Sequence, residues 1–328
     1  MKRTKQLLAL VLSAVLMLTL AGCGSSNEKT EKKKEKVVIA YQASVAYAPL
    51  IVMKEQKLLE KAYGDDIEVE YKVMDNGAAI NDGITAGNID VGAMGVSPAV
   101  TGVMAGVPYK IAFGLSAQPY AILTNQKNIK TLKDIKKNTK IAITQVNSQP
   151  HVLLGMACKE VLGDAHALDN NLEKLANPDG YSAMVSGAID CHMVISPFNF
   201  MEENSKEKAI HEIEVPEGIW ENGDTFIVGM VSESLKKDKP KVYDALCKSV
   251  EDAIKYINAN PKNTAEMLSS GYDESVEDIQ EWITDERSVY STKLQNVMKG
   301  VKFMVNEKFI DKGPSKLSEI AYDNVKGN

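Results

Sequence analysis

The most informative part of this chain is NIDVGAMGVSPAVTGVMAGVPYKIAF, residues 88–113. An apolar strand is expected at 89–94, a helix at 99–105 and a second strand at 109–113. Ser97 suits the N-cap of that helix, and Pro98 suits its first position. A strand–helix–strand unit of this length predicts a parallel sheet with a right-handed crossover.

The same alternation continues on both sides of this unit. Upstream, strands are expected at 37–41 and 67–73, and helices at 50–63 and 77–87. Downstream, we expect strands at 120–124, 140–144, 172–176, 189–195 and 225–231, and helices at 131–137, 151–162, 179–187, 240–258, 276–284, 292–303 and 315–324. The sequence shows no internal repeat, but its two blocks have similar topology. This predicts two α/β lobes whose ligand-facing loops follow the carboxyl ends of strands and line one cleft.

Length and charge bound both fold and function. A chain of 328 residues exceeds a typical single core, which also indicates two lobes. The formal net charge is −6, and no basic stripe is interleaved with aromatic residues, so nucleic acid is not an expected partner. Arg287 is the only arginine after Arg3, so a guanidinium clamp on an anion would have to come from Arg287.

The N-terminus has the pattern of an export signal. Lys2, Arg3 and Lys5 precede an apolar run at 7–20, which is too short to span a bilayer, and the run ends in LAGC at 20–23. This ending resembles the lipobox of bacterial lipoproteins, which implies a signal peptide at 1–22 and lipid on Cys23. Residues 23–36 would then be a lipidated, flexible tether. The alternative is an ordinary secretory signal with an incidental cysteine, and either signal places the protein outside the cytoplasm.

Catalytic and metal-binding motifs are not visible in the sequence. It contains no GxSxG, no Walker loop and no GxGxxG, and its histidines are scattered, so we expect no enzyme, no cofactor and no metal site. Cys158, Cys191 and Cys247 are not spaced as CxxC, and we interpret them as buried small side chains. One disulfide among them remains open at this point.

Five segments together resemble the substrate-binding proteins of ABC importers for nitrate, sulfonates and taurine. They are VVIAYQASVAYAPLIVMKEQKLLEK (37–61), GAAINDGITAGNIDVGAMGVSPAVTGVMAGVPYKI (77–111), NSQPHVLL (147–154), NPDGYSAMVSGAIDCHMVISPF (177–198) and DAIKYINANP (252–261). The resemblance implies the two-lobed type II periplasmic-binding-protein fold, of class α/β, with a parallel-rich sheet in each lobe and a hinge cleft. Lobe 1 would hold residues 37–121 plus 225–328, and lobe 2 residues 122–224. Strands near 120–124 and 225–231 would form the hinge.

The resemblance also implies a function and partners. The chain would be a monomeric, lipid-anchored protein on the outer face of the cell membrane. It would capture a small organic anion and deliver it to a membrane permease that works with a cytoplasmic ATPase. An alkanesulfonate or taurine is favoured ahead of nitrate, and a thiamine-pyrimidine-like aromatic precursor is the alternative ligand. An enzyme on the same fold and an adhesive surface lipoprotein are the remaining readings.

The expected ligand site lies at turns where helices begin, because a helix N-terminus offers free N–H groups and a partial positive charge to an anion. The candidate ligand-binding residues are Gln42, Ser44, Tyr47, Ser97, Gln118, Tyr120, Asn147, Ser148, Gln149, His151, Ser196 and Phe198. Ser148 and Gln149 match the family's Ser-Ser-Gln-His-like turn. The sequence departs from it at Pro150, which puts the reach of His151 in doubt.

Several of these candidates have a purely structural alternative. Ser97 could serve only as a helix cap, and Tyr47 and Phe198 could serve only in packing. Asp90 and Asp190 hold equivalent places in the two blocks, which favours a structural role in a turn for both.

Overall fold

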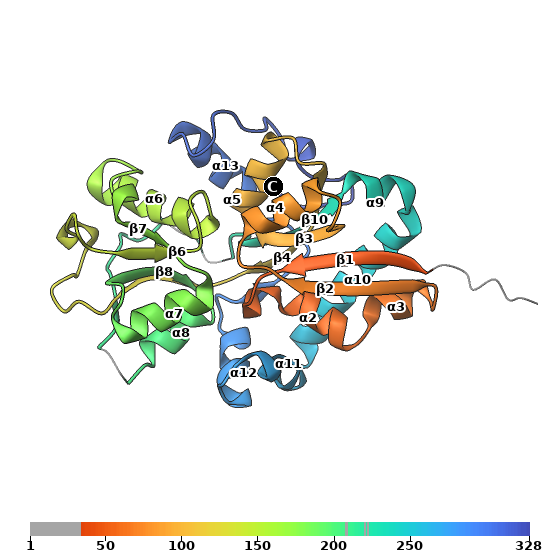
Figure 1. Ribbon diagram of the computed structural model, residues 1–328, viewed down its shortest axis with the longest axis horizontal. Helices are drawn as coiled ribbons and strands as arrows, with labels where there is room; N and C mark the ends of the chain where they lie inside the picture. Colours follow the sequence, from red (N-terminus) through yellow and green to blue (C-terminus); the bar gives the residue numbers. More distant parts are fainter. Residues whose placement is uncertain (1–33, 207–208, 220, 222) are drawn as a thin grey trace, which may run out of the picture. The chain divides into compact units, whose positions relative to one another are not determined.

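The computed structural model describes residues 34–206, 209–219, 221 and 223–328 (Figure 1). The predicted signal peptide, Cys23 and tether residues 24–33 therefore lie outside the described residues. The first strand, β1 (Glu35–Tyr41), begins two residues inside the predicted tether, because Glu35 already pairs with Ile67 of the neighbouring strand.

The strands form two separate mixed sheets. One sheet has six strands, and we call the part of the chain built on it lobe 1. Its order is β11 (Val289–Tyr290), β4 (Tyr109–Ala117), β10 (Ile227–Ser232), β3 (Val91–Gly95), β1 and β2 (Ile67–Val73). The strands β2, β1 and β3 are parallel, whereas β10 runs antiparallel to both β3 and β4.

The second sheet has five strands, and we call its part of the chain lobe 2. Its order is β7 (Leu172–Lys174), β6 (Ile141–Ile143), β8 (Cys191–Ile195), β5 (Tyr120–Thr124) and β9 (His211–Glu212). Here β7, β6 and β8 are parallel, and β5 is antiparallel to β8. Because Tyr120 pairs with Ile195, strand β5 belongs wholly to lobe 2, so its first two residues lie outside the lobe to which we assigned them.

The two sheets repeat one topology, as the two sequence blocks predicted. If the three parallel strands of each sheet are numbered along the chain, their order across the sheet is second, first, third: β2, β1, β3 in lobe 1 and β7, β6, β8 in lobe 2. An antiparallel strand lies beside the third. That antiparallel strand, β10 in lobe 1 and β5 in lobe 2, directly follows a passage of the chain from the other lobe. The two passages between the lobes therefore lie next to the third parallel strand of each sheet.

Helices cover both faces of the lobe 1 sheet and pack apolar side chains against it (Figure 1). On one face, α4 (Gly77–Thr85), α5 (Val96–Met104) and α13 (Val297–Asn306) share an apolar cluster with β1, β4 and β10. On the other face lie α2 (Ala48–Glu55), α3 (Leu58–Tyr63), α10 (Pro240–Ala259), α11 (Pro261–Leu268) and α12 (Val276–Thr284). The short helix α9 (Glu233–Asp238) joins β10 to α10.

Lobe 2 has the same layered arrangement. Helix α6 (Gln149–Leu162) packs its Leu154 and Ala157 against strand residues such as Ile122. Helices α7 (Asn177–Ser186) and α8 (Phe198–Glu203) cover the opposite face, where Met184 and Phe198 meet Leu123. Helix α6 also packs against α5 of lobe 1, so the two lobes meet along the starts of these helices.

Several predicted elements differ from the structure. The helix predicted at 50–63 is divided into α2 and α3 at Lys57, which adopts a left-handed backbone with φ 52°. The helix predicted at 315–324 is reduced to the single turn Leu317–Glu319. Most of the elements that we did not predict are short, such as α8, β9, α9 and β11. They were missed because a run of two to six residues shows too little hydrophobic periodicity to predict a helix or strand.

Asp90 and Asp190 have the structural role that their paired occurrence indicated. The Asp90 carboxylate accepts a hydrogen bond from the Val38 N–H at 2.9 Å, and the Asp190 carboxylate accepts one from the Lys140 N–H at 2.8 Å. The Asp90 carboxylate thus binds the middle of β1, and the Asp190 carboxylate binds the residue directly before β6 (Ile141–Ile143). Within the described ranges, every helix is too short or too polar to cross a membrane.

Candidate ligand-binding cleft

Four helices begin around one small cavity between the lobes. Gly77 opens α4, Gly95 is the N-cap of α5, Ser148 is the N-cap of α6, and Asn177 opens α7. All four residues line the same cavity, which has a volume of about 20 Å³. We call this space the cleft cavity. Because α4 and α5 belong to lobe 1 and α6 and α7 to lobe 2, the positive ends of helices from both lobes face it.

The start of α5 corrects our assignment of Ser97. The N-cap is Gly95 rather than Ser97, and the helix begins at Val96, so Pro98 is its third residue. The Val96 N–H donates to the carbonyl of Phe226 on the segment that leads into β10, at 3.1 Å. This tertiary hydrogen bond satisfies the first helical N–H group and lets the helix start earlier than a serine cap would require.

The amide oxygen of Gln149, from lobe 2, occupies the start of α5 in lobe 1. Gln149 Oε1 accepts hydrogen bonds from the Ser97 N–H at 2.9 Å and from Ser97 Oγ at 2.6 Å. Gly95 makes this approach possible, because a Cβ atom on Gly95 would lie only 2.7 Å from Gln149 Cβ. Since proline has no N–H group, all three of the first α5 residues are accounted for.

A second glutamine from the same turn reaches the start of α4. Gln145 Oε1 accepts a hydrogen bond from the Ala78 N–H at 3.2 Å, while the Asn76 side chain caps the next N–H group, that of Ala79, at 3.0 Å. Gln145 and Gln149 flank the α6 N-cap, so one turn of lobe 2 supplies amide oxygens to two helix starts of lobe 1.

A further hydrogen bond crosses between the lobes at Ser44. Ser44 Oγ donates to the carbonyl of Ser196 at 2.6 Å, and it also accepts from the Ala46 N–H at 3.0 Å. On the lobe 1 wall, Gln42 Nε2 donates to Tyr47 Oη at 2.7 Å. Burial raises the pKa of the Tyr47 phenol, so this hydroxyl stays protonated as a neutral donor.

Three backbone donors at the cavity wall have no such acceptor. The N–H groups of Gly77, Gln149 and Asn177 hydrogen-bond to nothing in the part of the chain that the structure describes. Each belongs to the first turn of a helix, where no intrahelical partner exists. None of the residues that line this cavity is charged, so the only positive potential there comes from the helix starts and polar side chains.

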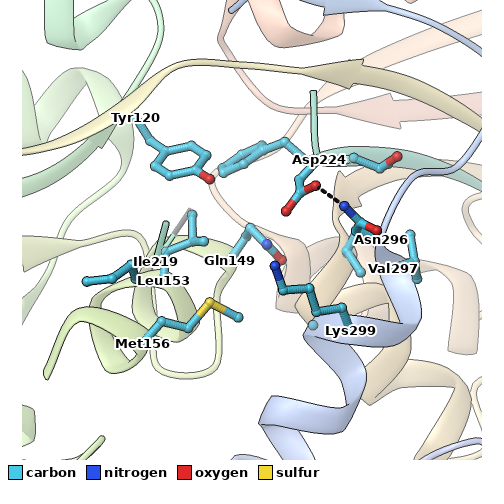
Figure 2. Close-up of a pocket in the computed structure, with 13 residues that line it drawn as sticks. Tyr120, Gln149, Leu153, Met156, Ile219, Asp224, Asn296, Val297 and Lys299 are labelled. Atoms are coloured by element: carbon cyan, nitrogen blue, oxygen red, sulfur yellow. Dashed lines mark hydrogen bonds between the residues drawn. The ribbon is translucent and has the colours of Figure 1, made fainter. Parts of the chain in front are cut away.

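A second cavity, of about 50 Å³, adjoins the first at Gln149 and Phe226 (Figure 2). Figure 2 shows Tyr120 on one side, with Asp224 and Lys299 on the other, and Gln149 between them. Asp224 accepts a hydrogen bond from Asn296 Nδ2 at 2.7 Å, and Lys299 is ion-paired with Glu221. The two charged residues that line this cavity, Asp224 and Lys299, therefore already interact with neighbouring side chains.

The predicted site residues fall into four groups in the structure. Gln42, Tyr47, Ser148 and Gln149 line the cleft cavity, and Ser97 joins them through Gln149. Tyr120 lines the second cavity, where its ring stacks on Phe226 with centroids 5.8 Å apart. Ser44 and Phe198 line a different, larger groove. Gln118, Asn147, His151 and Ser196 line none of these cavities.

His151 is turned away from the cleft. Its Nδ1 accepts a hydrogen bond from the Asn147 N–H at 2.9 Å, so the ring proton sits on Nε2 and faces Asp169 Oδ1 at 3.0 Å. Burial lowers the pKa of His151 and outweighs the opposing effect of Asp169. Pro150, the departure from the family's turn, directly precedes this histidine. His151 and Asn147 therefore shape the turn rather than line the cleft.

Two other candidates are buried behind the cleft. Both amide atoms of Gln118 and the hydroxyl oxygen of Ser196 are buried and make no hydrogen bond within the described part of the chain. Arg287 does not line the cleft cavity. Its guanidinium binds Asp285 at 2.7 and 2.9 Å and lies over the Phe200 ring of α8, 5.6 Å from the ring centroid.

Several residues that the structure brings to the cleft were not among the predicted site residues. Gln145, Asn177 and Phe226 are the main ones. Gln145 follows a predicted strand by one residue, and this position was a usable signal. Phe226 offered no signal, because it reaches the cavity only through the pairing of β10 between β3 and β4.

Metal ligands and disulfides do not contribute to the described structure. Among the described residues, no group of three or more His, Cys, Asp or Glu side chains could hold a metal ion. Cys158, Cys191 and Cys247 are free thiols, and Cys247 is only half-buried. Burial raises the pKa of Cys158 to about 12 and that of Cys191 to about 11, so these two remain protonated.

The fold and the cleft together define a two-lobed α/β protein with the periplasmic-binding-protein fold. The nitrate-binding protein NrtA of Synechocystis PCC 6803 superposes with a TM-score of 0.71 at 14% identity, covering 90% of this chain and 86% of that one. The aliphatic sulphonate-binding protein SsuA of Escherichia coli superposes with a TM-score of 0.66 at 16% identity, covering 89% of this chain and 93% of that one.

The family follows from the sequence match. Residues 30–270 match the family model described as the NMT1-like family, and the chain belongs to that family. A curated relative, the putative aliphatic sulfonates-binding protein of Bacillus subtilis (strain 168), is 30% identical over 200 residues. That match spans 59% of this chain and 58% of the relative, which is less than two thirds of the relative's length.

Proposed function

We propose that the protein is the extracytoplasmic substrate-binding component of an ABC importer and holds a small organic anion in the cleft cavity. The main observation behind this proposal is that four helices begin around one cavity, which no charged residue lines. Membership in the NMT1-like family and the names of the relatives support the class of ligand. The protein captures its ligand and hands it to a permease, and it catalyses no reaction.

The anion is held without arginine. Its oxygens accept from the unpartnered N–H groups of Gly77, Gln149 and Asn177, and one oxygen takes the place of Gln149 Oε1 at the start of α5. Each helix start contributes about 0.3–1 kcal/mol to a nearby negative charge. Since a sulfonate or nitrate group offers three oxygens at fixed angles, several donors from different directions can be satisfied together.

Ligand entry requires the lobes to separate. A cavity of about 20 Å³ holds roughly one water molecule, so a sulfonate enters only when the glutamine bridges open. After entry, contacts with both lobes are made together only in the closed arrangement, which the ligand therefore stabilises. This is the hinge-closing behaviour of a binding protein.

The proposal is tested by titration calorimetry of the protein lacking residues 1–22, with taurine, an alkanesulfonate, nitrate and a thiamine pyrimidine in parallel. We expect the tightest binding for a sulfonate. Binding of the pyrimidine alone would support the aromatic alternative and contradict our ligand class. If none of the four ligands binds, the cleft mechanism fails for these anions.

Delivery also requires that the protein stay at the membrane, and we propose that lipid on Cys23 anchors it there. Substitution of Cys23 by Ala removes the only cysteine near the signal. In detergent-phase partitioning of expressing cells, the wild type should enter the detergent phase and Cys23→Ala the aqueous phase. Retention of the variant in the detergent phase would contradict the lipobox.

A further inference from the structure

A separate groove of about 460 Å³ lies between the lobes, on the side of the sheets that carries α7, α8, α11 and α12 (Figure 1). Four aromatic side chains line it: Tyr41 and Tyr272 from lobe 1, and Tyr181 and Phe198 from lobe 2. We call this space the aromatic groove. Its volume falls within the range of small-molecule sites, whereas the cleft cavity is far smaller.

The apolar lining of the groove is exposed to solvent at Val73, whereas Tyr41 and Phe198 are buried, with 6% and 4% of their surface exposed. Val73, at the end of β2, is 61% exposed there, the highest value for a large apolar side chain among the described residues. Tyr181 and Phe198 lie with ring centroids 6.2 Å apart, and Tyr272 packs edge-on against Trp282 at 5.6 Å. The rings are thus fixed by neighbours on one side, and each also borders the groove. Such surfaces suit a flat aromatic ring.

The charged residues of the groove are mainly acidic. They comprise one base, Lys54, and three acids, Glu55, Asp273 and Glu274, so the formal sum is 1 − 3 = −2. Lys54 is itself paired with Glu55 at 3.5 Å. Asp273 and Glu274 make no ion pair within the described part of the chain. The groove therefore repels an anion and attracts a cation, in contrast to the uncharged cleft cavity.

We propose that the aromatic groove is a second ligand site, which binds a planar aromatic ring that carries a protonated amine. The ring packs among Tyr41, Tyr181, Phe198 and Tyr272, and the amine faces Asp273 and Glu274. Because the lining comes from both lobes, the bound cation holds the lobes together and favours the closed arrangement. This site is independent of the anion site proposed above and does not rest on it.

The test uses benzamidine as the probe, in calorimetric titrations of the protein lacking residues 1–22. Benzoate has the same ring with the opposite charge, and cyclohexylamine has the charge without the aromatic ring. We expect saturable benzamidine binding at least about tenfold tighter than that of either control. Equal affinity for benzoate would overturn the charge argument, and equal affinity for cyclohexylamine would overturn the stacking argument. Absence of benzamidine binding would overturn the proposal itself.

Variants locate the site. Tyr181→Ala should weaken benzamidine binding about tenfold, and Asp273→Asn with Glu274→Gln about two- to fivefold. Tyr256→Ala is the matched control, because Tyr256 is a half-buried tyrosine on α10 that does not line the groove. Thermal melts exclude unfolding as the cause. If Tyr181→Ala and Tyr256→Ala bind benzamidine equally, the ring does not bind in this groove.

The same variants separate this proposal from the anion site. Taurine titrations of Tyr181→Ala should match the wild type, whereas Gln42→Ala should leave benzamidine affinity unchanged, because Gln42 lines the cleft cavity but not the groove and bonds only within lobe 1. Loss of benzamidine binding in Gln42→Ala would place the probe in the cleft and overturn the groove as its site. Failure of taurine to bind any variant would affect only the anion proposal.

Discussion

Gln149 Oε1 and the Ser97 N–H lie 2.9 Å apart across the cleft, and the Ser97 hydroxyl donates to the same oxygen. An amide oxygen of one lobe thus sits at a helix start of the other, where an anion oxygen would be well placed. Gln149 Oε1 thus occupies the position that we propose for one oxygen of the anion. Because Gln149 belongs to lobe 2 and Ser97 to lobe 1, this hydrogen bond also joins the lobes.

Gln149→Ala should therefore loosen the closed arrangement in the absence of ligand. The variant loses both hydrogen bonds to Ser97, so the open population rises and small-angle scattering should report a larger radius of gyration. Gln280→Ala, on α12 and away from the cleft, is the control. An unchanged scattering profile for Gln149→Ala would show that this bridge does not hold the lobes.

Ser97→Ala and Ser148→Ala should separate ligand binding from helix capping. Ser97 caps no helix and donates toward the cleft, so its loss should weaken sulfonate binding about tenfold to hundredfold, the equivalent of 1.5–3 kcal/mol for a charged hydrogen bond. Ser148 is the α6 N-cap, so Ser148→Ala should also lower the free energy of unfolding by about 1 kcal/mol. Calorimetry and urea denaturation measure the two effects.

Arg287→Ala is the control for the arginine-free mechanism. Its guanidinium is bound to Asp285, and we expect sulfonate affinity within about twofold of the wild type. If Arg287→Ala abolishes binding while Ser97→Ala does not, the helix starts do not hold the anion.

A histidine contact between the lobes should make stability depend on pH. His166 Nδ1 faces Asp169 at 2.8 Å and its Nε2 faces the Glu307 carbonyl at 2.6 Å. Both partners are acceptors, so both hydrogen bonds form together only when both ring nitrogens carry protons. Burial lowers the pKa of His166, but the Glu307 carbonyl and Asp169 outweigh it and the net shift is upward.

A raised pKa in the folded state stabilises the protein below the unfolded pKa of about 6.5, and this contribution is lost as the pH rises through the folded pKa. His166→Gln should therefore lower the melting temperature more at pH 5.5 than at pH 8.5. The comparison is made as wild type minus variant at each pH, which cancels other titrating groups. The same difference at both pH values would rule out a protonated His166.

Two glycine positions inside helices should respond in opposite directions to alanine. A Cβ atom on Gly155 of α6 would lie 2.5 Å from Phe309 Cζ and 3.3 Å from the Ala165 carbonyl. Gly155→Ala should therefore destabilise the protein by about 1–3 kcal/mol through overpacking. At Gly300 of α13 nothing lies within 4 Å, so Gly300→Ala should stabilise it by about 0.5–1 kcal/mol. Urea denaturation measures both, and a similar response would show that Phe309 yields.

The sequence was sufficient for the fold because the long elements carry a clear period. Strand β2 alternates apolar and charged residues, and α10 and α12 are strongly amphipathic, so their bounds were predicted within one or two residues. Where a helix starts after a strand, as at Ser148 and Gln149, the predicted site residues line the cleft cavity, and their role in ligand binding stays a prediction. The predicted tether was too long by two residues, because pairing of Glu35 with Ile67 depends on the sheet.

The remaining site features depend on contacts between distant segments. The early start of α5 follows from the Phe226 carbonyl, which is 130 residues further along the chain (226 − 96). The rotation of His151 follows from Asp169 and from packing against Phe309, with ring centroids 5.0 Å apart. No local pattern encodes these partners, so the sequence could place residues near the cleft without stating which side chains point into it.

The passage between lobes has a consequence for how such proteins can be rebuilt. The chain leaves lobe 1 after Ala117 and returns at Phe226, whose N–H donates to the Ser116 carbonyl at 2.9 Å. The two ends of the inserted segment are therefore adjacent, and a tight turn could join them without disturbing the pairing of β4 with β10. Lobe 2 is therefore an insertion that could be exchanged as a unit. Recombination at these two points would replace the residues that lobe 2 contributes to the binding site and would leave the sheet of lobe 1 intact.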